Sequence, residues 1–264
     1  MSSVCPEHHD SQGRRDRALE CQHGRVSDLE RQLESIEDSL RRGVYRGGPW
    51  SRFVTEASLR SQAERRAIVE DVSRVSEMLH RRHRRPEVGL IVGSLLATAA
   101  ATAGVVLIEL GLNGDGSQFV AGAVLLIIAL QPLTKTCIGL LAGIRFSGVY
   151  LRGVEPRVKL RFGTYLAAPA GGRIVFHLAG TVGSPAAAAW AWWRAAGTDT
   201  AGIEIAGVVI AIAFWMLVAI QLVTLTLGVS GRGHRLTRVS SGGMAGKEIR
   251  AAFARRQASR SGDS

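Results

Sequence analysis

The sequence has almost no lysine, few cysteines and hardly any charge within its apolar stretches. Only three of its 33 basic residues are lysine, and its three cysteines are an odd number. Cys137 lies inside an apolar run, so the cysteines do not form the even set of a disulfide framework. The first 80 residues are polar, and we therefore expect the first apolar run to act as an uncleaved anchor rather than a signal peptide.

Motifs of common enzyme classes are also missing. The chain has no H-E-x-x-H, no G-x-S-x-G, no P-loop and no acidic pair inside its apolar runs. Cysteines and histidines gather near the N-terminus, but their spacing matches no zinc pattern: Cys5, His8, His9, Cys21 and His23. We therefore predict no catalytic residue, no metal ligand and no cofactor.

Long apolar segments are the main positive feature of the sequence. Residues 88–112, 119–144 and 205–229 are nearly uncharged, and each is long enough for a helix to cross about 30 Å of hydrocarbon. A fourth segment, 174–193, is uncharged but richer in alanine and glycine. The net charge of +11 gathers beside these runs, which is typical of membrane orientation. We expect a lipid environment and no nucleic-acid partner.

The distribution of basic residues favours four spans with both termini in the cytoplasm. Four arginines precede the first span: Arg81, Arg82, Arg84 and Arg85. The loop 145–173 carries six basic residues against one glutamate, whereas the turn 113–118 carries none. Since basic flanks lie inside, 174–193 has to cross as the third span to bring the tail 231–264 back. The alternative is a re-entrant hairpin folded at Gly183–Pro185, which would place the tail outside.

Small residues in the third candidate span suit a buried helix. Ala179 and Gly183, like Gly180 and Ser184, are small residues four apart, the spacing that allows close helix packing in membranes. Such a segment would be a poor helix against lipid. We therefore expect it inside the bundle.

The polar segment 25–85 carries two apolar stripes at helical spacing. The first stripe has heptad spacing and comprises Val26, Leu29, Leu33, Ile36 and Leu40; the second comprises Ile68, Val72, Val75 and Leu79. Two interpretations stay open: an intramolecular hairpin in which the stripes cover each other, or a coiled coil that joins copies or binds a protein partner. Residues 1–24 are expected to form a disordered tail.

Polar side chains inside a span are costly and mark functional candidates. Gln131 and Lys135 share one face of the second span, His177 lies near the inner end of the third, and Gln221 lies in the inner half of the last. They predict a polar pocket that opens inward, in which Lys135 binds an anion or carries a proton. The alternative is that Lys135 snorkels to the interface and His177 is simply packed.

Two basic features flank the spans. The arginines at 81, 82, 84 and 85 are candidates for contact with anionic lipid, although they also serve orientation alone. In the loop, Val158, Leu160 and Phe162 alternate with Lys159 and Arg161, a pattern of either a short strand or an amphipathic surface segment.

Together these patterns predict an all-α fold, with a polytopic four-helix transmembrane bundle at 86–230 and a cytoplasmic helical hairpin or coiled-coil arm before it. The leading functional hypothesis is a non-enzymatic scaffold or accessory subunit, whose arm self-associates or binds a partner. The alternative is a small transporter, channel or lipid-acting protein that uses the intramembrane polar residues.

Overall fold

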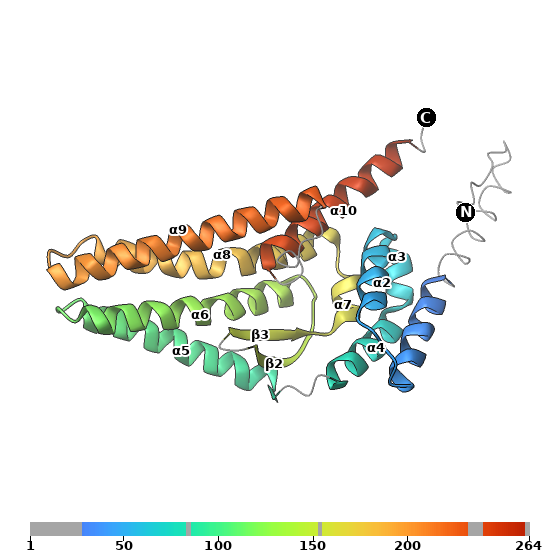
Figure 1. Ribbon diagram of the computed structural model, residues 1–264, viewed down its shortest axis with the longest axis horizontal. Helices are drawn as coiled ribbons and strands as arrows, with labels where there is room; N and C mark the ends of the chain where they lie inside the picture. Colours follow the sequence, from blue (N-terminus) through green and yellow to red (C-terminus); the bar gives the residue numbers. More distant parts are fainter. Residues whose placement is uncertain (1–27, 83–85, 153–154, 232–239, 262–264) are drawn as a thin grey trace.

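The computed structural model describes residues 28–82, 86–152, 155–231 and 240–261, and they are mostly helical. Four of the helices are long and apolar enough to cross a membrane: α5 (Leu90–Gly111), α6 (Gly116–Leu141), α8 (Ala170–Ala195) and α9 (Ala201–Ser230). They lie side by side as an elongated bundle (Figure 1). These four helices are compatible with the multi-pass architecture expected from the sequence.

The order of burial among the four helices explains the weak hydropathy of the third. The buried share rises from 11% in α9 through 17% in α5 and 28% in α6 to 44% in α8, while mean hydropathy falls in the same order. The most apolar helices therefore carry the most exposed surface, and the small-residue helix is the most buried of the four. α8 is continuous through Gly183 and Pro185, so the re-entrant hairpin is not what forms.

Glycines allow the membrane helices to approach closely. A Cβ atom at Gly122 of α6 would lie 2.6 Å from the Gly104 carbonyl oxygen and 2.7 Å from the Ile108 nitrogen, both backbone atoms of α5. At Gly183 of α8, a Cβ would lie 2.6 Å from Thr134 Oγ1 of α6. The contact at Gly183 follows the small-residue packing predicted for the third span, and the contact at Gly122 shows the same kind of packing between the first two.

The two ends of the bundle differ. The short turns after α5 and α8 lie at one end, and the N-terminal helices, the sheet, α7 (Phe162–Ala167) and α10 (Ser241–Ser261) lie at the other (Figure 1). The sheet is antiparallel, in the order β1 (Glu87–Val88), β2 (Phe146–Arg152), β3 (Glu155–Leu160). The basic loop thus forms a strand pair, the first of its two predicted alternatives, and this adds a small sheet to the helical fold.

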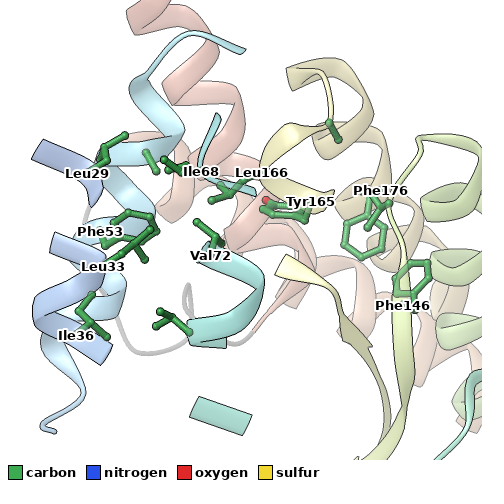
Figure 2. Close-up of a cluster of buried hydrophobic side chains, with 14 residues drawn as sticks. Leu29, Leu33, Ile36, Phe53, Ile68, Val72, Phe146, Tyr165, Leu166 and Phe176 are labelled. Carbon is green, nitrogen blue, oxygen red and sulfur yellow. The ribbon is translucent and has the colours of Figure 1, made fainter. Parts of the chain in front are cut away.

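The N-terminal arm is a cluster of short helices. A helix through residues 28–41 precedes α2 (Gly48–Leu59), α3 (Gln62–Ala67) and α4 (Val69–Arg82). The apolar stripes share one intrachain core, with Phe53 of α2 between them and with Tyr165 and Phe176 continuing the core toward the bundle (Figure 2). Within the described residues the stripes therefore cover each other, and a coiled coil is not shown. Val26 lies outside the described residues.

The C-terminal helix α10 packs back onto the bundle. Its first turns contact α9 closely, because a Cβ at Gly246 would lie 2.4 Å from the Leu225 carbonyl oxygen and one at Gly228 would lie 2.4 Å from that of Gly243. Ala245 and Glu248 are buried against α8 and α9. Much of what the sequence presents as a basic tail is thus a packed helix.

Candidate functional site

A cavity of about 590 Å³ lies at the end of the bundle that carries the sheet, between α6, α8, α9, the β2–β3 pair and the start of α10. All four polar residues singled out from the sequence line it: Gln131, Lys135, His177 and Gln221. They come from three different helices. The fold therefore brings together side chains that lie up to 90 positions apart in the sequence.

The charged residues among the described lining of this cavity are basic. The lining includes the basic side chains Lys135 of α6 and Arg157 of β3, and no acidic residue is among the described residues that form it. Hydroxyl groups come from Thr224 of α9 and Ser241 of α10. The remaining wall is largely apolar and is formed by Pro132, Val158, Leu160, Phe176 and Ile220. Such a mixture suits a ligand with an anionic group and an apolar part.

Lys135 reaches the cavity because α8 has a glycine opposite it. A Cβ atom at Gly180 would lie 1.9 Å from Lys135 Cε and 2.9 Å from Ser241 Oγ. The Gln131 side chain also donates from Nε2 to the Gly180 carbonyl oxygen, at 3.4 Å. Helix α6 continues for six residues beyond Lys135 to Leu141, so the lysine is part of a continuous helix and not of its end.

Gln221 connects the cavity to the beginning of α10. Its Oε1 accepts a hydrogen bond from the Gly242 backbone N–H at 3.3 Å. A Cβ at Gly242 would lie 2.7 Å from both the Gln221 carbonyl oxygen and Thr224 Oγ1. The glycine thus permits the first turn of α10 to lie directly on α9 and to form part of the cavity wall.

His177 belongs to a buried network that sequence reasoning missed. Its Nε2 lies 2.9 Å from Tyr165 Oη, and Tyr165 donates to Glu248 Oε1 at 2.7 Å. Glu248 Oε2 accepts from Arg173 Nε and Nη2 at 3.0 and 2.8 Å. Burial and the Glu248 charge raise the pKa of the Tyr165 hydroxyl well above its ordinary value.

The glycines and serine of "SGGMAG" were the available signal that residues beyond Ser240 form a packed helix.

Two further arginines surround this network. Arg65 of α3 donates from Nε to the Leu166 carbonyl oxygen at 2.8 Å, and Arg255 of α10 donates to the Ser58 carbonyl oxygen of α2. Burial, with the charges of Arg173 and Arg255, lowers the pKa of Arg65 to about 10. The arm is therefore joined to α7 by a buried polar contact and to α10 by a partly buried one.

The predicted lipid-contact arginines do not all fall within the described structure. Arg81 is exposed and pairs with Glu77 at 3.4 Å, and Arg82 donates to the Gly43 carbonyl oxygen at 3.2 Å. Arg84 and Arg85 lie outside the described residues. Contact of this group with anionic lipid remains a prediction.

No group of three or more His, Cys, Asp or Glu side chains within the described ranges is placed to hold a metal ion. Comparison with protein-family models, with curated proteins and with solved structures found no match to this chain. A functional conclusion therefore has to come from the site itself.

Proposed function

We propose that this chain is a multi-pass membrane protein, with both termini in the cytoplasm, that binds an anionic ligand in the cavity formed by α6, α8, α9, α10 and the β2–β3 pair. The observation that carries the proposal is the cavity lining, which includes Lys135 and Arg157 and, among its described residues, no carboxylate. A basic group enclosed by apolar walls attracts an anion more strongly than one in water, because screening is weaker there.

The chemistry that fits this lining is a phosphate or phosphate ester. Lys135 and Arg157 supply cationic donors, while Gln131, Gln221 and Ser241 supply neutral ones. Two sources offer this group: free phosphate and the headgroup of an anionic phospholipid. The apolar wall and the position of the cavity at the end of the spans are compatible with the second source as well as the first.

The scaffold hypothesis rested on the apolar stripes of the arm and on the absence of catalytic motifs, and it stays a prediction. It required an apolar stripe on the arm for a partner, but Leu29, Leu33 and Ile36 are 0–3% exposed inside the chain's own core. Assembly through this stripe would first have to open the arm. Self-association and protein partners remain predictions that no contact in the structure supports.

The proposed orientation of the bundle in the membrane rests on the distribution of charged residues at its two ends. The arm and the basic β2–β3 segment lie at the same end of the bundle, whereas the opposite turn at 112–115 carries one aspartate and no basic residue (Figure 1). Cytoplasmic flanks of membrane spans carry the excess of arginine and lysine. This supports placing the cavity on the cytoplasmic side.

The experiment compares two probes on the full-length protein. Binding of inorganic phosphate is measured by titration calorimetry in nanodiscs of phosphatidylcholine, and bound phosphatidylglycerol is counted by native mass spectrometry from mixed nanodiscs. Replacing Lys135 by Met keeps the length of the side chain and removes its charge. We expect about a tenfold or greater loss of affinity for the bound probe, since a charged hydrogen bond contributes about 1.5–3 kcal/mol.

Glycine variants provide a matched pair. Gly180→Ala retains the lysine charge but fills the space that Lys135 Cε occupies, whereas Gly171→Ala on the same helix meets no atom within 4 Å. Only the first variant should weaken binding. Arg81→Gln controls for lipid attraction by the arm. Phosphate binding alone identifies a soluble ligand and phosphatidylglycerol binding alone a lipid; equal affinities for wild type and Lys135→Met would refute the proposal.

A further inference from the structure

A chain of hydrogen bonds leads from α10 through the protein interior to the cavity. It runs from the Arg173–Glu248 ion pair to Tyr165 and ends at His177, which lines the cavity. All four residues are buried, between 0% and 6% exposed. Tyr165 of α7 contacts His177 directly, and Glu248 of α10 reaches the histidine only through Tyr165.

The donors and acceptors in this series of hydrogen bonds determine which nitrogen of His177 carries the proton. A carboxylate paired with arginine has no proton to give, so Tyr165 donates its O–H to Glu248. The oxygen of Tyr165 can then only accept, and the neutral His177 ring has to supply the proton from Nε2. Nδ1 is left as an acceptor, so it can bond the P–OH group of a phosphate monoanion or a glycerol hydroxyl of phosphatidylglycerol, but not an ionised phosphate oxygen.

We propose that Tyr165 and Glu248 are positioning residues for the anion site: through their hydrogen bonds they hold the His177 ring in one orientation and one tautomer. This proposal rests on the function proposed above. It gives α10 a role in ligand binding, because Glu248 reaches the network only when α10 is docked on the bundle. A ring held in place loses less rotational freedom when the ligand binds.

α10 also contacts the site and the arm at other points. Its first turn bonds Gln221 through the Gly242 N–H, and further along Arg255 bonds the Ser58 carbonyl oxygen of α2. Docking of α10 thus affects two of the four cavity residues singled out from the sequence, Gln221 directly and His177 through Tyr165. Since coupling between two equilibria is reciprocal, ligand binding should in turn stabilise the docked helix.

A double-mutant cycle tests the positioning role. Affinity for phosphate, or for phosphatidylglycerol if that is the probe bound, is measured for wild type, Tyr165→Phe, His177→Gln and the double variant. If Tyr165 acts through His177, Tyr165→Phe weakens binding about fivefold to tenfold in the wild-type background and not further in His177→Gln. A general structural effect would weaken binding by the same factor in both backgrounds and would overturn the proposal.

A second measurement does not depend on the ligand. The ¹⁵N NMR signals of His177, assigned by their loss in His177→Gln, should show the proton on Nε2 at neutral pH. Replacing the ion pair by Arg173→Met with Glu248→Leu frees the Tyr165 proton for donation to Nε2, so the histidine proton should move to Nδ1. An unchanged tautomer in this variant and in Tyr165→Phe rules out the positioning role. Failure of wild type to bind either probe would instead count against the proposed function.

Discussion

Glu248 of α10 and Arg173 of α8 form an ion pair inside the protein, with 2.8 Å between Glu248 Oε2 and Arg173 Nη2 and 75 residues between them in the chain. Arg173 is fully buried and also donates from Nη1 to the Leu166 and Ala168 carbonyl oxygens, each at 3.1 Å. An arginine with this many partners can be buried because its hydrogen-bonding groups are satisfied. The pair makes α10 part of the folded unit.

Removing the carboxylate alone should be strongly destabilising. Glu248→Leu leaves the Arg173 charge buried without its counter-charge, which costs about 3–5 kcal/mol, whereas Arg173→Met together with Glu248→Leu should recover much of the loss. Unfolding of the full-length protein in mixed micelles by denaturant measures both. The exposed Glu34→Gln serves as a control and should stay within about 0.5 kcal/mol of wild type. A single variant as stable as wild type would contradict the buried pair.

The approach of α5 and α6 gives a second prediction. Gly122→Ala places a Cβ at 2.6–2.7 Å from backbone atoms of Gly104 and Ile108, so the helices have to move apart. We expect a loss of about 1–3 kcal/mol in the free energy of unfolding. Gly171→Ala, which meets open space near the start of α8, should be neutral or slightly stabilising. Equal stability of the two variants would show that α5 and α6 are not packed this closely.

Acid sensitivity should arise where the arm meets the sheet. Lys159 of β3 is 5% exposed and pairs with Glu87 of β1 at 3.0 Å and with Glu77 of α4 at 3.3 Å. Burial alone would raise the pKa of Glu77, but the hydrogen bonds and charges of Lys159 and Arg81 outweigh it, and the net pKa lies below its usual 4.5.

The direction in which stability changes with pH follows from the linkage between proton binding and folding. A carboxyl group whose folded-state pKa is depressed contributes stability above its unfolded pKa, and loses it as the pH falls through the folded value. The melting temperature should therefore decline on acidification below about pH 4.5, the unfolded pKa of Glu77. Melting curves between about pH 6 and pH 3 measure the decline, which should be shallower in Lys159→Met. An identical pH profile in that variant would mean that this contact does not contribute.

Labelling of single cysteines can show which end of the bundle faces the cytoplasm. In a background without Cys5, Cys21 and Cys137, an impermeant thiol reagent applied to intact cells should label Asp199→Cys in the turn between α8 and α9. It should label Phe253→Cys, exposed on α10, only after the membrane is permeabilised. If both cysteines are labelled from outside, the C-terminus is not cytoplasmic. If only Phe253→Cys is labelled in intact cells, the whole topology is inverted.

The sequence by itself determined which helices are long and apolar enough to span a membrane. Runs such as 88–112 and 205–229 contain too little charge and are too long for a soluble core, and the placement of arginine predicted an even number of crossings. It also singled out Gln131, Lys135 and His177, because polar groups in an apolar run are conspicuous. Local composition contains these signals, and no knowledge of packing is needed to read them.

Tertiary structure decided which of these groups meet and what surrounds them. Glu248 lies in a basic, polar stretch that looks like a solvated tail, and only the contact of Gly242 and Gly246 with α9 carries it into the interior. Arg173 likewise looked like one more basic residue of a loop. The physical reason is that burial and ion pairing depend on contacts between elements far apart in the chain, and composition near one residue contains no information about its distant partner.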